Sequence, residues 1–191
     1  FMSAIQLLLL SVGLFGAGAL AALLLRSAAN IAHLLSGVAS LAGSITGAIC
    51  VLAAAGTALR GAAPQSVALL SVPPFGDLAL RLDGLSLLIV AVISLVGIAA
   101  SLYMLGTAPE AASIGFLTNL FIGSMLLVAV VSNTFFFLVF WELMTLVSYL
   151  LVIWEPEKQE AVRAGFIYML VAHAGAALIM VAFRILFQKS G

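Results

Sequence analysis

Long stretches without a charged residue constrain the fold of this chain more than any other feature of its sequence. Asp, Glu, Lys and Arg are absent from residues 1–25, 27–59, 84–109, 111–141, 143–154 and 164–183. About 20 apolar residues in a helix cross the roughly 30 Å hydrocarbon core of a bilayer, where a helix satisfies its own backbone hydrogen bonds. We therefore predict an all-α, polytopic transmembrane helix bundle of about six spans, which forms a single transmembrane domain over residues 1–191. The predicted spans are residues 4–25, 31–59, 84–105, 114–131, 134–153 and 163–187.

The composition excludes several other classes of protein. Only 7% of the residues are charged and 65% are apolar, whereas a soluble domain carries about 25% charged residues. The net charge is zero, so the chain lacks the basic surface that nucleic-acid binding requires. Cys50 is the single cysteine, which excludes an internal disulfide and a cysteine-held cluster. We expect the lipid bilayer as a partner, no nucleic acid, no cofactor or metal, and no catalytic redox residue.

Short polar segments separate the apolar runs. Ser132 and Asn133 alone divide the fourth predicted span from the fifth. Residues 60–83 form the one long polar connection, and the alternation from Asp77 to Asp83 could pair as a short hairpin. We expect this connection to be an aqueous cap. Within the second span, Gly43 and Gly47 have the spacing that favours close helix packing.

Glu142 is an acidic residue deep inside a predicted span. It lies about eight residues, or about 12 Å, from the start of the fifth span. An ionised carboxylate at that depth costs at least about 2.5–3.5 kcal/mol, so it should be protonated, paired or hydrated. Thr145 and Tyr149 follow at i+3 and i+7 on the same helix face. This polar face indicates proton exchange, and a neutral glutamate that only bonds a neighbouring helix is the structural alternative.

His173 is a second polar residue near the middle of a span. If the fifth and sixth spans are antiparallel neighbours, His173 and Glu142 lie at similar depths, about 15–17 Å from the same side. They could meet or share a water molecule, and a histidine pKa near 6.5 suits a proton relay. Arg184 lies at i+11 on the same face and could mark the far end of a hydrated path. A purely structural hydrogen bond explains His173 equally well, whereas a haem held by His33 and His173 is disfavoured.

Three segments resemble, in order, helices of one family. Phe137 to Leu151, with Glu142, resembles the fifth helix of the antiporter-like, proton-translocating subunits of respiratory complex I, Mrp antiporters and membrane-bound hydrogenases. Phe166 to Gly175 looks like the sixth helix of that family, and Leu82 to Ser86 looks like the entry to its third. Pro73 to Phe75 is among the features that most resemble the hydrogenase-4 component B and formate hydrogenlyase branch.

The resemblance implies the function that we predict. Glu142 would be the proton-exchanging residue of a membrane subunit in an energy-converting oxidoreductase complex. The expected proton pathway consists of Glu142, His173, Thr145, Tyr149, Tyr168 and Arg184. A structural or assembly subunit and a Na⁺/H⁺ antiporter subunit are the alternatives. The resemblance also implies a bacterial or archaeal cytoplasmic membrane, with the N-terminus and the 60–83 loop on the periplasmic side.

The resemblance reaches only the opening third or so of such a subunit. Family members continue to a broken seventh helix, whose lysine pairs with the glutamate, and to a second inverted repeat. Lys158 and Lys189 lie at predicted span ends and cannot replace that lysine. We therefore expect other membrane subunits as partners, including a chain that carries the rest of the fold; a fragment or a degenerate relative is the alternative.

Overall fold

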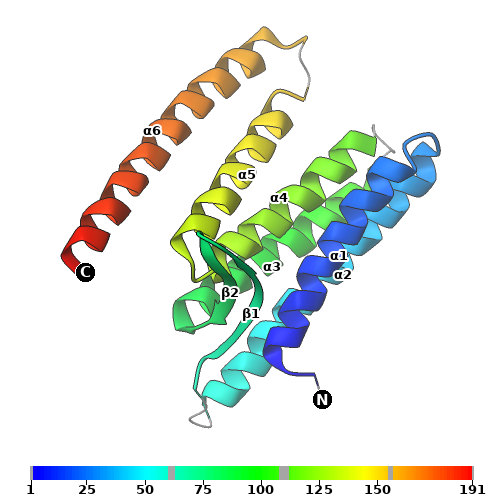
Figure 1. Ribbon diagram of the computed structural model, residues 1–191. Coiled ribbons are helices and arrows are strands. Elements are labelled where there is room, and N and C mark those ends of the chain that lie inside the picture. Colours follow the sequence, from blue (N-terminus) through cyan, green and yellow to red (C-terminus); the bar gives the residue numbers. More distant parts are fainter. Residues whose placement is uncertain (1, 60–62, 108–111, 155–156, 191) are drawn as a thin grey trace.

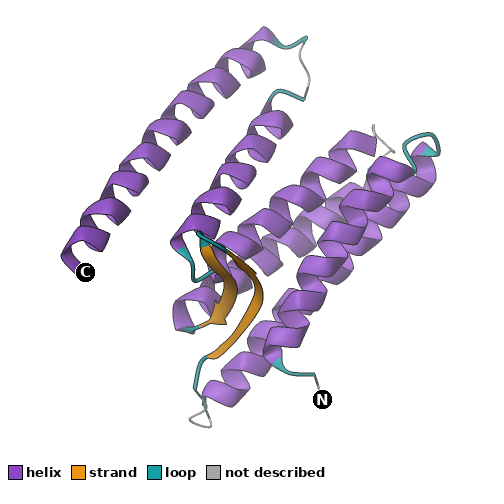
Figure 2. Ribbon diagram, in the orientation of Figure 1, coloured by secondary structure: helices purple, strands orange, loops and turns teal. Residues whose placement is uncertain are grey.

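The residues that the structure describes form six long helices and one β-hairpin (Figures 1 and 2). The computed structural model describes residues 2–59, 63–107, 112–154 and 157–190. The elements in chain order are α1 (Ala4–Leu24), α2 (Ala29–Ala58), β1 (Gln65–Val72), β2 (Gly76–Leu82), α3 (Gly84–Gly106), α4 (Ala112–Val130), α5 (Thr134–Val152) and α6 (Gln159–Ser190). All six helices are long and apolar enough to cross a membrane. The prediction of six spans is confirmed, although α6 begins four residues earlier than expected.

The short break between the fourth and fifth spans is present where the sequence predicts it. Helix α4 ends at Val130 and α5 begins at Thr134. Asn133 caps α5, because its side-chain oxygen accepts hydrogen bonds from the backbone N–H groups of Phe135, at 2.8 Å, and Phe136. An asparagine at this position satisfies backbone donors that the first turn of a helix leaves without partners.

Helices α1 to α4 pack into one bundle. The main contacts join α1 to α2 and α4, and α2 to α3. Gly43 and Gly47 of α2 allow the close approach that their spacing indicates. A Cβ atom on Gly43 would lie 3.0 Å from the ring of Phe15 on α1, and one on Gly47 would lie 2.5 Å from Oγ of Ser94 on α3. The interpretation of these glycines as packing positions is therefore confirmed.

The connection between α2 and α3 is partly buried against the bundle, which the predicted aqueous cap did not include. Strands β1 and β2 pair antiparallel, with Gly76 at a positive φ of 88° in the turn. Leu80 and Leu82 of β2 are almost completely buried and belong to the apolar core of the bundle. The charges and prolines of this segment predict a polar connection, but the alternation in β2 places Leu80 and Leu82 on the protein side, while Leu69 and Leu70 of β1 are exposed.

The hairpin also contacts the start of α5. Ser132 donates backbone and side-chain hydrogen bonds to the carbonyl of Ala79, at 2.9 and 3.0 Å. Asn133 Nδ2 donates to the carbonyl of Phe75 at 3.1 Å, and the Phe75 ring stacks on that of Phe135 at 4.2 Å. These contacts attach the beginning of α5 to the bundle.

Helices α5 and α6 continue from the bundle in succession, with α5 packed on α4 and α6 packed on α5 (Figure 1). Within the chain, α6 buries little of its surface. Large apolar side chains that are exposed on it include Phe166, Val171, Leu178 and Phe187. The pair α5 and α6 therefore carries a wide apolar surface that the described residues leave uncovered.

Candidate functional site

Glu142 of α5 and His173 of α6 face each other across the contact between these two helices. Oε2 of Glu142 lies 3.4 Å from Nε2 of His173. This distance is typical of an ion pair or a long hydrogen bond rather than of a short charge-assisted bond. The two side chains are 31% and 48% exposed within this chain. The expectation that the two residues could meet rested on counting residues along antiparallel helices, and the structure brings them together.

The contact of Nδ1, the second ring nitrogen of His173, indicates which nitrogen carries the proton of the neutral ring. Nδ1 lies 3.0 Å from the backbone carbonyl of Met169, one turn earlier on α6. A carbonyl oxygen only accepts hydrogen bonds, so this contact assigns the proton of a neutral ring to Nδ1. Nε2 then presents a lone pair to Glu142. One proton can lie either on the carboxyl group or on Nε2, which gives a neutral pair in the first state and an ion pair in the second.

Thr145 and Tyr149 lie on the same side of α5 as Glu142, as predicted, but they have different surroundings. Thr145 is buried, and its hydroxyl donates to the carbonyl of Trp141 at 3.0 Å. The Tyr149 ring lies against α6, where a Cβ atom on Gly165 would come within 3.3 Å of it. Neither hydroxyl contacts Glu142 or His173 in the part of the chain that the structure describes.

Tyr168 joins α6 to α5 through a residue that the sequence did not single out. Its hydroxyl lies 2.6 Å from Oγ of Ser148. Ser148 in turn donates to the carbonyl of Thr145 at 2.9 Å. Because Ser148 has a single hydroxyl proton, Tyr168 acts as the donor to it. Ser148 could have been suspected only from its small polar side chain beside Tyr149, since its partner lies 20 residues away.

Arg184 lies farther along α6. It is exposed and follows His173 by eleven residues, which is about 16 Å along the helix axis. Over residues 2–59, 63–107, 112–154 and 157–190 the structure shows no polar contact between Arg184 and the Glu142–His173 pair. Its place at the end of a hydrated path stays a prediction.

His33 lies away from this site. It belongs to α2 in the first bundle, whereas α6, which carries His173, packs on α5. This arrangement agrees with the interpretation that the two histidines do not form a ligand pair.

Comparison with known proteins identifies the class to which this architecture and this helix pair correspond. Residues 131–191 match the family described as NADH:quinone oxidoreductase/Mrp antiporter, TM. The match covers α5 and α6, with Glu142 and His173, and the hairpin contact at Ser132 and Asn133. The chain is a multi-pass integral membrane protein that contains a segment matching this family, and it is similar to antiporter-like membrane subunits of the complex I, hydrogenase and Mrp type.

Among individual proteins, the chain is similar along its whole length to hydrogenase-4 component B of Escherichia coli (strain K12). The two are 40% identical over 198 residues, which is 100% of this chain and 28% of that protein. A putative antiporter subunit mnhA2 of Staphylococcus aureus (strain MSSA476) is 34% identical over 120 residues, which is 60% of this chain and 15% of the relative.

A solved structure agrees with this assignment. A chain of the membrane-bound sulfane sulfur reductase, an archaeal respiratory membrane complex, matches with a TM-score of 0.69 and 25% identity. The match covers 99% of this chain and 28% of the other chain. The present chain thus spans less than a third of the length of relatives that it matches throughout. The predicted resemblance to antiporter-like subunits, and to hydrogenase-4 component B among them, is confirmed by these similarities.

Proposed function

We propose that Glu142 exchanges protons within the membrane as part of an antiporter-like subunit, with His173 as its immediate proton partner. Two contacts carry this proposal. Oε2 of Glu142 lies beside Nε2 of His173, and Nδ1 of the same ring lies beside the backbone carbonyl of Met169. In this arrangement one proton can move between the carboxyl oxygen and the ring nitrogen without any change in the helices. Such a pair suits a proton relay, because small changes in its surroundings decide which group holds the proton.

The surroundings of Glu142 and His173 support such a proton relay. Both side chains are partly exposed within the chain and lie where α5 and α6 carry uncovered apolar surface. In a membrane an uncompensated carboxylate is costly, so the ionised form of Glu142 needs a neighbouring cation or water. A cation that approaches the carboxyl group therefore favours release of its proton, and a cation that leaves favours uptake of a proton.

Thr145, Tyr149, Tyr168 and Arg184 complete the proposed pathway. Tyr168 and Ser148 hold α6 against α5 close to His173, and Arg184 lies where a path along α6 would approach the membrane surface. Their proposed tasks are to position the pair and to order water on its way to it.

The proposed partners are other membrane polypeptides of a multi-subunit complex. The relatives bear names of components and subunits, and one similar structure is a respiratory membrane complex. The exposed apolar face of α6 needs a cover other than the described residues if a hydrated path is to be separated from lipid. We place the protein in the cytoplasmic membrane of a bacterium or archaeon, as the sources of its relatives suggest.

The test is proton translocation by membrane vesicles that contain the assembled complex. Glu142→Gln should remove translocation, and Glu142→Asp should retain part of it. Glu160→Gln is the matched control, since it makes the same change on an exposed residue of α6 and should leave translocation unchanged. Normal translocation in an assembled Glu142→Gln variant would contradict the proposal and favour a structural task for the site.

Cation antiport is a second candidate function, because one relative is a putative antiporter subunit. The two functions predict different proton movement in response to a Na⁺ gradient. If the chain works in Na⁺/H⁺ antiport, a Na⁺ gradient alone should drive proton movement that Glu142→Gln removes. If it works only in redox-driven translocation, a Na⁺ gradient should have no effect.

A further inference from the structure

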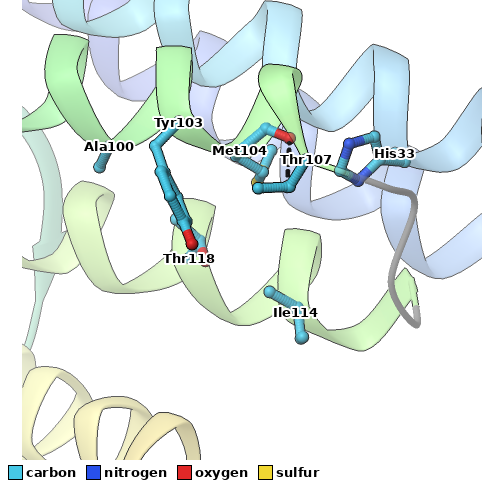
Figure 3. A pocket seen from close by; sticks show the side chains of 7 residues that line it. All are labelled: His33, Ala100, Tyr103, Met104, Thr107, Ile114 and Thr118. Carbon is cyan, nitrogen blue, oxygen red and sulfur yellow. Dashed lines mark hydrogen bonds between the residues drawn. The ribbon is translucent and has the colours of Figure 1, made fainter.

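A cavity in the first bundle contains polar atoms that the proposed proton site does not use. It has a volume of about 250 Å³ and lies between α2, α3 and α4 (Figure 3). The lining residues are His33, Ala100, Tyr103, Met104, Thr107, Ile114 and Thr118. For comparison, an apolar cavity of about 150 Å³ already accommodates a benzene molecule. The cavity is therefore large enough for part of an organic molecule.

His33 brings an unused hydrogen-bonding atom to this cavity. Its Nε2 is buried and has no hydrogen-bond partner among the residues that the structure describes. Thr107, beside it in Figure 3, already donates its hydroxyl proton to the carbonyl of Met104 at 2.9 Å. Tyr103 and Thr118 bring two further hydroxyl groups to the lining of the cavity. A buried nitrogen without a partner is costly, so a ligand that satisfies Nε2 would gain that free energy.

The position of the cavity along the helices indicates the depth at which a ligand would bind. Tyr103 lies three residues before the end of α3, and His33 lies four residues after the start of α2. These offsets correspond to about 5 and 6 Å. A helix of 23 residues is about 35 Å long, slightly longer than the hydrocarbon core. The cavity therefore lies at the boundary between hydrocarbon and headgroups, a depth at which tyrosine is enriched.

The cavity opens toward the outside of the bundle. Tyr103 is 76% exposed, although it forms one wall. On a membrane-spanning helix such a side chain faces lipid or a neighbouring protein. Arg26, in the turn between α1 and α2, is exposed at the same end of the bundle and places a positive charge beyond the helix ends.

We propose that this cavity binds a glycerophospholipid. Nε2–H of His33 donates a hydrogen bond to one ester carbonyl, and the adjoining part of the acyl chain lies along Ala100, Met104 and Ile114. The ester groups of a phospholipid lie at the depth of the cavity, and an ester carbonyl only accepts hydrogen bonds. The proposal therefore assigns the Nε2–H tautomer to His33, whereas His173 carries its proton on Nδ1. The lipid would stabilise the junction of α2, α3 and α4 independently of proton exchange at Glu142.

The first experiment maps the lipid by photo-cross-linking in native membrane vesicles that contain the full-length protein. Two phosphatidylglycerol probes are compared, one with a diazirine beside the ester group and one with a diazirine at the end of the acyl chain. The probe labelled beside the ester should react preferentially with the peptide that contains Tyr103 and Met104. Stronger labelling of that peptide by the chain-end probe would contradict the proposed orientation.

Variants of the cavity separate specific binding from general contact with lipid. Ala100→Phe fills the cavity and should remove the labelling, whereas Ala99→Phe makes the same change on an exposed neighbour outside the cavity and should preserve it. His33→Leu should lower the labelling about 2- to 10-fold, as expected for one lost hydrogen bond. His33→Gln keeps an N–H donor at a similar distance and should retain most of it.

Two results would overturn the proposal. One is equal labelling of the Ala100→Phe and Ala99→Phe variants, which would show that the probe reports only the surrounding bilayer. The other is the release of an isoprenoid quinone, rather than a phospholipid, when the molecule held by the purified protein is identified by mass spectrometry. Neither result bears on Glu142, so the proton-exchange proposal is tested separately.

Discussion

At the scale of single residues, the structure distinguishes polar side chains that can exchange protons from those that only hold helices together. Glu142 and His173 present a carboxyl oxygen and a ring nitrogen to each other. Most other polar side chains within the spans bond to backbone carbonyls, as Ser44 does to Ser40 and Ser11 does to Gly43. Such bonds satisfy the hydroxyl group locally and leave it little part in a relay.

Tyr168 provides a test at this scale. Its hydroxyl donates to Ser148 across the contact of α5 and α6, so Tyr168→Phe should reduce the free energy of unfolding by about 0.5–1.5 kcal/mol. Unfolding in mixed micelles measures this change. Tyr149→Phe is the matched control, because the hydroxyl of Tyr149 has no hydrogen bond within the described residues. Equal losses in the two variants would contradict the assigned bond.

The sequence could locate Glu142 and His173 but not their complete surroundings. Charged and imidazole groups inside apolar runs are conspicuous, and the rise of a helix converts sequence position into depth. Ser148 was missed because its bond to Tyr168 depends on the rotation of two helices about their axes. The acceptor for Nδ1 of His173, the carbonyl of Met169, was missed because a backbone group leaves no signal in the sequence.

At the scale of elements, Asn133 links the start of α5 to the hairpin. Asn133 caps α5 through its side-chain oxygen and bonds Phe75 through its side-chain nitrogen. Asn133→Asp keeps the cap and loses the donor, whereas Asn133→Ala loses both. We expect Asn133→Ala to cost about 1 kcal/mol more than Asn133→Asp in unfolding measurements. Equal stability of the two variants would show that the cap contributes nothing.

Close contacts between helices make a second test at this scale. A Cβ atom on Gly97 of α3 would lie 2.5 Å from Oγ of Ser44 on α2, whereas one on Gly13 of α1 would meet no atom within 4 Å. Gly97→Ala should therefore destabilise the bundle by about 1–3 kcal/mol through overpacking. Gly13→Ala should be neutral or slightly stabilising, since alanine favours helix. A thermal unfolding series compares the two, and an unaffected Gly97→Ala variant would contradict the packing described.

The N-cap of α3 predicts how stability depends on pH. Asp83 accepts a hydrogen bond from the backbone N–H of Ser86 at 2.9 Å, and this bond lowers the pKa of the Asp83 carboxyl group below its usual value near 3.8. Because the folded pKa is the lower one, the ionised cap stabilises the protein above the unfolded pKa. This contribution is lost as the pH falls through the folded pKa.

Asp83→Ala should therefore be less stable than the wild type at pH 7, and the difference should shrink below about pH 4. Asp77→Ala, on an exposed residue of the hairpin, is the control and should show a smaller difference at pH 7. Unfolding curves at several pH values measure both variants. A difference for Asp83→Ala that stays constant down to pH 3 would contradict the assigned cap.

At the scale of the whole molecule, the chain is a bundle of four helices followed by a helix pair with an uncovered face. The six spans could be predicted from the charge-free runs, because a charged side chain is costly at any position of a span within the hydrocarbon core. The burial of Leu80 and Leu82 in the core could not be predicted from the sequence, because it depends on how the hairpin folds back onto the bundle. The uncovered face of α6 likewise became visible only once the packing of the helices was known.

The central claim is that the carboxyl group of Glu142 gains and loses a proton while the protein works. Infrared difference spectroscopy of the assembled complex, recorded between resting and energised states, tests it most directly. The account predicts a protonated-carboxyl band that changes on energisation and is absent from the difference spectrum of the Glu142→Gln variant. A difference spectrum with no such band, or a band that persists in Glu142→Gln, would contradict it.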